Sequence, residues 1–349
     1  GQGRGRGDHL VSVSLLAASG SLLVVSTAGF TRPTTVFAVN VASDVMQWAQ
    51  ILEPLKPPAL PQSHLQEAVD VVRSALEKVH VWKVAHEADG HVVEGWVLTT
   101  GAPDQPVILE IHGGPHAVTP AGFATDIATM LSMGFAVVLP NYRGSISFGT
   151  EYAQALHGRV GEMDVADCRQ VLAVALKQFP NLDADRVGVF GGSHGGFMTG
   201  HLLGTGDEIF KAGCLWNPVT NMGAMMAATE IPEWIVEEGL SRKLGEPIWP
   251  LSPEEVQELY RRSPISTVRK VRPEAGVMVV LGDADHRVPP LNGREWFSAV
   301  REQRRGGKGP APLIYEYPGE GHSLPGAESL AHVTVTIVDW FAEQLGVEL

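Results

Sequence analysis

Hydrophobic and polar positions follow different patterns in two parts of the chain. Up to about residue 50, short runs rich in Val and Leu alternate with glycine- and proline-containing breaks, and no helical period appears among them. The runs predict three β-strands, at 10–16, 22–26 and 36–41. Three strands are too few to complete a sandwich or a propeller, so we interpret this part as a fragment of such a structure.

A proline-rich stretch separates this region from the rest, with four prolines between residues 54 and 61. Such a cluster is typical of a connector rather than of a helix or a strand interior. We therefore predict two domains, a β-rich segment at 1–62 and a larger domain at 63–349.

The pattern changes beyond the connector. Apolar spacings of three and four predict a helix over 66–76. Two β-type runs, at 79–86 and 92–99, flank the dipeptide Asp89-Gly90 and predict a hairpin.

Further along, short, mainly apolar runs alternate with longer helical stretches. The apolar runs, which are typical of strands buried on both faces, lie at 107–111, 136–140, 187–190 and 277–281, and a further strand is predicted at 313–317. The helical stretches lie at 123–133, 165–179, 196–203, 291–301 and 328–345. This alternation predicts an α/β fold in which helices cover both faces of a mainly parallel sheet.

Net charge, apolar run length and cysteine content limit the partners and the compartment that we expect for this protein. A formal net charge of −13 argues against nucleic acid, and no run reaches the ~20 apolar residues that cross a membrane. Two cysteines, Cys168 and Cys214, give no disulfide framework, so we expect a reducing, cytoplasmic compartment.

The chain begins with Gly1 rather than Met, so we expect either processing or a missing N-terminal part of a longer protein.

The strongest chemical signal is the motif G-x-S-x-G around Ser193, which directly follows a β-type run and precedes a helical one. That context places a serine at a sharp strand-to-helix turn, with its hydroxyl exposed at the carboxyl end of the sheet. A serine hydroxyl is a weak nucleophile and needs a base, which in turn needs an acid to orient it.

An acid and a base follow in the order that this turn requires. Asp283 and Asp285 follow the apolar run 277–281, and His322 follows the run 313–317. His322 would accept the serine proton, and the acid would fix the tautomer of its imidazole. The residue pattern alone leaves Asp283 as a rival to Asp285.

An oxyanion also needs hydrogen-bond donors. The backbone N–H of His194, after the nucleophile, is one candidate, and that of Gly114 in the HGGP loop is the other. His112 is interpreted as support for this loop. Arg143 is interpreted either as a substrate contact or as half of a structural ion pair.

Other kinds of site lack a signal in this sequence. The thirteen histidines show no H-E-x-x-H and no Cys/His ligand spacing, so we predict no metal. Without a Walker loop or a convincing G-x-G-x-x-G, we predict no cofactor. The adjacent pair Glu237-Glu238 is interpreted as a solvated helix face.

Several motifs together resemble the prolyl oligopeptidase family, and within it the acylaminoacyl-peptidase branch. They are GGSHGGF at 191–197, HGGP at 112–115, NYRGS at 141–145, WNPV at 216–219 and EIPEW at 230–234. The likeness covers roughly residues 79–349. The family pattern Gly-x-x-Asp-x-x-Val-Pro falls on 282–289 and thereby selects Asp285 over Asp283.

The resemblance implies an α/β-hydrolase fold preceded by a β-propeller, of which residues 1–50 resemble the final strands. It implies a serine peptidase with the triad Ser193, Asp285 and His322. The expected reaction is release of an N-acylated amino acid from a short peptide, and the expected assembly is a homo-oligomer. Two alternatives stay open: a carboxylesterase or lipase of the same fold, and a non-catalytic binding protein.

Overall fold

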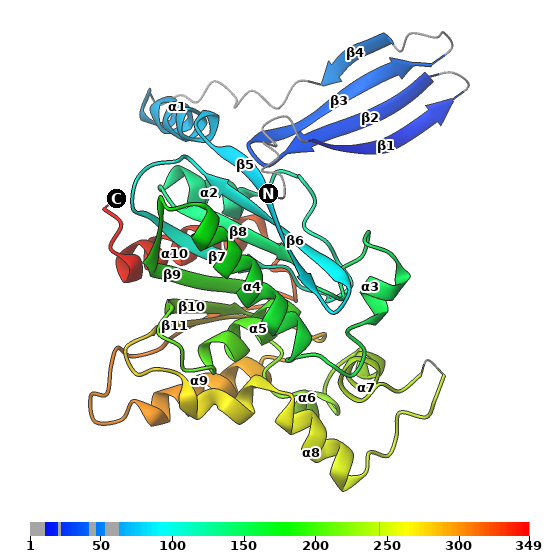
Figure 1. Ribbon diagram of the computed structural model, residues 1–349, viewed down its shortest axis with the longest axis vertical. Helices are drawn as coiled ribbons and strands as arrows, with labels where there is room; N and C mark the ends of the chain where they lie inside the picture. Colours follow the sequence, from blue (N-terminus) through cyan, green and yellow to red (C-terminus); the bar gives the residue numbers. More distant parts are fainter. Residues whose placement is uncertain (1–10, 20–21, 42–46, 53–62, 244, 349) are drawn as a thin grey trace.

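The computed structural model describes residues 11–19, 22–41, 47–52, 63–243 and 245–348. In this part of the chain the strands form two separate sheets, one of four strands and one of eight (Figure 1). The predicted proline-rich connector and the domain boundary after residue 62 lie outside the described residues.

The smaller sheet is antiparallel throughout, in the order β1-β2-β3-β4. Its strands are β1 (Ser12–Ser19), β2 (Leu22–Gly29), β3 (Arg32–Asn40) and β4 (Gln47–Leu52). The first three were predicted, but β4 was not, because two glutamines interrupt its apolar pattern. The sheet contacts the rest of the protein through the N–H and hydroxyl of Ser12, which donate to the carbonyl of Ala121, and through Phe30, whose ring packs edge-on against Trp96.

The larger sheet has the strand order β12-β11-β10-β9-β7-β8-β6-β5. Its strands are β5 (His80–Ala88), β6 (His91–Thr99), β7 (Gln105–Ile111), β8 (Ala136–Asn141), β9 (Leu182–Gly192), β10 (Phe210–Trp216), β11 (Gly276–Gly282) and β12 (Leu313–Tyr317). All neighbours from β8 to β12 pair in parallel, whereas β6 is antiparallel to both β8 and β5.

The predicted hairpin is confirmed. Strands β5 and β6 pair from His80 opposite Thr99 to Ala88 opposite His91. Asp89 and Gly90 both have positive φ, at 48° and 81°. Two successive positive φ angles define the type I′ turn, whose twist matches that of a two-stranded ribbon.

Helices cover both faces of this sheet (Figure 1). Within β7, Leu109 faces one hydrophobic cluster and its neighbour Ile108 the other, because successive side chains of a strand point to opposite faces. The first cluster holds α4 (Met163–Gln178), α5 (His194–Leu203) and α9 (Leu291–Gln303); the second holds α1 (Ser63–Glu77), α2 (Thr125–Ser132) and α10 (Ala327–Leu345). The predicted fold, a mainly parallel sheet between two helical layers, is therefore confirmed.

Shorter helices lie in the connections near the carboxyl ends of the parallel strands. They are α3 (Thr150–Gln154), α6 (Met222–Met225), α7 (Pro232–Leu240), α8 (Pro253–Arg261) and the 3₁₀ helix η1 (Pro264–Lys270). All but α3 belong to the long connection between β10 and β11. Their apolar residues join the first cluster, so this connection is packed onto the domain rather than solvated.

Candidate active site

Ser193 lies in a strained turn between β9 and α5. Its φ of 58° and ψ of −119° place a non-glycine residue in a sparsely populated region of backbone space. Backbone hydrogen bonds keep Ser193 in this conformation: its N–H donates to the carbonyl of Trp216, and its carbonyl accepts from the N–H of Phe197. The geometry is that of the sharp strand-to-helix turn that the motif predicts.

Close backbone contacts explain the glycines around Ser193. A Cβ on Gly191 would lie 2.5 Å from the carbonyl carbon of Gly195, and one on Gly195 would lie 2.1 Å from the carbonyl oxygen of Ile111. A Cβ on Gly192 would meet nothing nearer than 3.7 Å. The turn therefore depends on glycine at 191 and 195 but not at 192.

The substitution Gly191→Ala is expected to destabilise the protein by roughly 1–3 kcal/mol, because its methyl group must displace backbone that has no room to move. Gly192→Ala is the matched control, since the same methyl group fits there. Urea unfolding of both variants measures the difference. Equal free energies of unfolding would contradict this account of the turn.

His322 and Asp285 lie together beside this turn. The Nδ1–H of His322 donates to Asp285 Oδ2 at 2.6 Å. The other carboxylate oxygen of Asp285 accepts from the N–H groups of Arg287 and Val288, both at 2.9 Å, so the acid is fixed and buried. The rival Asp283 instead accepts from the Gly319 N–H at 2.6 Å, and the described part of the structure shows no hydrogen bond between Asp283 and His322.

Asn217 holds the loop that carries His322. It lies just after β10, with a positive φ of 41°. Its side-chain NH₂ donates to the carbonyl of His322 at 2.7 Å, and its side-chain oxygen accepts from the Gly282 N–H at 2.8 Å. No role was predicted for this residue, because what distinguishes it is its left-handed backbone conformation at the end of a strand, which the sequence alone does not reveal.

A cavity of about 230 Å³ opens at Ser193 and His322. Gly114 and Arg287 contribute to its polar part. Its apolar wall consists of Val219, Met225, Ile231, Trp234 and Val288. No carboxylate lines the cavity among the described residues.

The loop after β7 brings Gly114 to the same cavity. Gly114 has φ 122°, a conformation that favours glycine. A Cβ on the preceding Gly113 would lie 3.3 Å from the Cβ of Ser193, so the loop and the turn are packed closely. The structure thus places the predicted donor residue Gly114 beside Ser193.

His112 and His194 are both held inside the domain. The ring of His112 stacks on Tyr142, with 4.4 Å between centroids, and its Nε2 lies 2.9 Å from Ser145 Oγ. Burial lowers the pKa of His112 to about 4, so its ring is neutral at pH 7. The Nε2–H of His194 donates to the buried Asp164 at 2.8 Å, which fixes the first residue of α5.

Arg143 lies in a buried ion pair. Its guanidinium donates two hydrogen bonds to Asp167, at 2.8 and 2.7 Å, and one to Asp89 at 2.6 Å. The arginine side chain is 5% exposed and does not line the cavity. Its contacts are those of an ion pair that joins the end of β8 to α4 and to the hairpin turn.

The interpretation of Glu237-Glu238 as a solvated face is wrong for Glu238. This residue is 2% exposed, and its carboxylate faces His116 rather than water. Successive residues on a helix point about 100° apart, so adjacent glutamates of α7 cannot share one environment.

Comparisons with known proteins identify a family and several relatives of this chain. The model of the prolyl oligopeptidase family matches residues 121–348. Acylamino-acid-releasing enzyme 2 of Oryza sativa subsp. japonica is 36% identical over 248 residues, which are 70% of this chain and 31% of the relative. The human acylamino-acid-releasing enzyme is 33% identical, over 72% of this chain and 34% of its own. This chain thus spans about a third of the length of these relatives.

A solved structure supports the same fold. Acylaminoacyl peptidase of Pyrococcus horikoshii superposes with a TM-score of 0.76 at 20% identity, covering 96% of this chain and 50% of that protein. Among the described residues, no helix has the length and apolarity needed to span a membrane. From the family match and the curated relatives, this chain belongs to the prolyl oligopeptidase family of serine peptidases.

Proposed function

We propose that this chain carries the catalytic domain of a peptidase that releases an N-acylated amino acid from short peptides. The observation that carries the proposal is the hydrogen bond of 2.6 Å from His322 to the buried Asp285, beside the cavity that His322 shares with Ser193. A base oriented by an acid, next to a strained and accessible serine, is the arrangement that activates a hydroxyl nucleophile.

The proposed reaction begins with attack of Ser193 Oγ on the scissile carbonyl carbon. His322 Nε2 takes the hydroxyl proton as the C–O bond forms, and the N–H groups of Gly114 and His194 stabilise the oxyanion. The proton then passes to the leaving amine as the C–N bond breaks, which leaves an acyl-enzyme. Water attacks this ester with His322 as base, and the N-acylated amino acid leaves. Asp285 stabilises the imidazolium at both stages.

The charged groups that line the cavity favour a peptide substrate whose N-terminus is acylated. The described residues that line it include one cation, Arg287, and no carboxylate. A free α-ammonium group would lose its hydration there, and the neighbouring carboxylate of Glu230 is already in an ion pair with Arg287 at 3.3 Å, whereas an acyl group carries no charge. The apolar wall formed by Trp234 and its neighbours suits the acyl group or a small apolar side chain. The names of the curated relatives point to the same substrate class.

We also propose the division into domains at residues 62 and 63, with strands β1–β4 as part of a larger β-propeller. Four antiparallel strands in sequential order form the unit from which propellers are built. This sheet contains no strand of the larger sheet among the described residues, which supports a separate domain.

Three substrates test the proposed specificity: acetyl-alanyl-nitroanilide, alanyl-nitroanilide and a short-chain nitrophenyl ester. We expect kcat/KM for the blocked amide to exceed that for the free amine by at least about 100-fold, because the ammonium stays unpaired in the cavity. Preference for the free amine would contradict the proposed specificity. Turnover of the ester alone would assign the chain to the carboxylesterases.

A further inference from the structure

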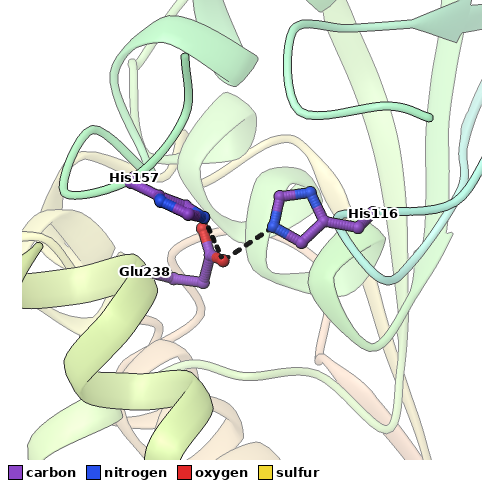
Figure 2. A group of neighbouring side chains, drawn as sticks. All are labelled: His116, His157 and Glu238. Carbon is purple, nitrogen blue, oxygen red and sulfur yellow. Dashed lines mark hydrogen bonds and ion pairs between the residues drawn. The ribbon is translucent and has the colours of Figure 1, made fainter. Parts of the chain in front are cut away.

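Three side chains that the proposed reaction does not use converge near the loop that carries Gly114. His116 lies on this loop, two residues beyond Gly114, His157 lies in the connection between α3 and α4, and Glu238 lies on α7. Figure 2 shows both imidazole rings directed at the carboxylate of Glu238. One ligand atom from each of the three residues lies within 4.8 Å of the other two.

The spacing of these atoms fits one small metal ion. His116 Nε2 and His157 Nε2 lie 2.8 and 3.5 Å from Glu238 Oε1. Nitrogen and oxygen ligands of tetrahedral zinc, at bond lengths of about 2.0–2.1 Å, are separated by roughly 3.3 Å. Both distances to Glu238 Oε1 are thus within about half an ångström of this separation, and the ligand atoms of the two histidines lie within 4.8 Å of each other.

The carboxylate of Glu238 supplies a second, independent observation. The residue is 2% exposed, and its Oε2 has no hydrogen-bond partner. A buried carboxylate oxygen without a partner is costly, and a bound cation removes that cost by accepting its lone pair. Oε2 is thus a carboxylate oxygen of the cluster that has no partner and is available to bind a cation.

His116 and His157 differ in their hydrogen bonds and in their exposure to solvent. The Nε2–H of His116 donates to Glu238 Oε1 at 2.8 Å, and a bound zinc ion would displace this proton and take the Nε2 lone pair. His116 Nδ1 lies 2.8 Å from the carbonyl of Gly144, to which it can donate. Metal-bound histidines almost always donate their second ring N–H in this way, which fixes the ring orientation. His157 is the more exposed of the two and has the longer contact, so it can adjust to an incoming ion.

The site is accessible from solvent. His116 and His157 lie on the wall of an open hollow of about 580 Å³, together with polar groups of Ser147, Thr150 and Gln154. An ion can enter from this hollow, and water can occupy the remaining coordination position. Two imidazoles and one carboxylate form a ligand set that suits zinc.

From this geometry we propose that His116, His157 and Glu238 bind a zinc ion that ties the Gly114 loop to α7 and to the α3–α4 connection. The ligands are 41 and 81 residues apart in the sequence (157 − 116 and 238 − 157), so no local spacing motif reveals them. The ion would restrain a loop that also contributes a proposed oxyanion donor. The site itself does not depend on the assignment of Ser193.

Titration calorimetry with zinc chloride tests the site on protein freed of metal by a chelator. We expect one saturable site in the unchanged protein, and binding weakened by more than about 100-fold in His157→Ala, which loses one of three ligands. His91→Ala is the matched control, since His91 contacts Tyr152 instead and lies outside the cluster, so its zinc affinity should equal that of the unchanged protein.

A thermal readout adds a second criterion. Zinc should raise the melting temperature of the unchanged protein and of His91→Ala by mass action, but not that of His157→Ala. Glu238→Gln, which keeps the shape of the side chain and removes its charge, should also weaken binding. The proposal is overturned if the unchanged protein binds no zinc, or if His157→Ala binds it as tightly. Because neither readout uses peptide hydrolysis, both outcomes are independent of the proposed function.

Discussion

Ser193→Ala is expected to reduce kcat/KM for acetyl-alanyl-nitroanilide by about 10⁴- to 10⁶-fold while the protein remains folded. The substitution removes only the oxygen that forms the acyl-enzyme, and the backbone contacts that hold the turn stay in place. Residual turnover would come from the oxyanion donors alone. Initial rates under pseudo-first-order conditions, with circular dichroism as the folding check, measure the effect.

A matched serine and a covalent probe make this prediction specific. Ser298 is an exposed residue of α9 away from the cavity, so Ser298→Ala should keep full activity. A fluorophosphonate should label the unchanged protein at Ser193 and leave Ser193→Ala unlabelled, as read by peptide mass spectrometry. If Ser193→Ala kept more than about a tenth of the activity, the assignment of the nucleophile would be wrong.

The largest expected effect on stability comes from Asp167→Ala, which should lower the free energy of unfolding by about 3–5 kcal/mol. Arg143 is 5% exposed, and Asp167 supplies two of the three hydrogen bonds that its guanidinium donates to side chains. Without this carboxylate a buried cation keeps only Asp89, which is 70% exposed and itself hydrated. The cost is that of leaving a charge in the interior without its main partner.

Asp89→Asn is the control for the buried pair, because it removes the charge of the exposed partner and keeps a residue that tolerates the positive φ of this turn. Its effect should be smaller, since Asp89 is 70% exposed and supplies one of the three hydrogen bonds, so the buried guanidinium keeps both bonds to Asp167. Urea unfolding of both variants, followed by tryptophan fluorescence, gives the comparison. Equal losses of stability would contradict the view that the buried carboxylate holds Arg143.

The strands and helices that could be predicted are those whose hydrophobic pattern along the sequence matches their burial in the structure. The run 277–281 is apolar without interruption because β11 is buried on both faces of the sheet. Strand β10 was not predicted, although Cys214 lies in its apolar run, because Lys211 and Gly213 interrupt the pattern. The helices between β10 and β11 are short, and their packing is set by distant residues.

The candidate site was predicted as far as it follows from chain order and strand ends. Ser193, Asp285 and His322 each follow a strand of one parallel sheet, and the carboxyl ends of such strands meet at one edge. The hydrogen bonds of Asn217 and the burial of Glu238 could not be predicted, because they depend on how the end of β10 and one side of α7 pack against the rest of the domain. Only the folded arrangement determines that.

The place of β12 in the sheet has a consequence for biosynthesis. This strand pairs only with β11 among the described strands, and the proposed base enters the growing polypeptide 129 residues after the proposed nucleophile (322 − 193). While the ribosome adds this last stretch, the serine turn can already be formed, yet no imidazole is present to activate it. With the proposed roles of Ser193 and His322, we expect hydrolysis to begin only once β12 has docked on β11 and the loop after it has brought His322 to the site.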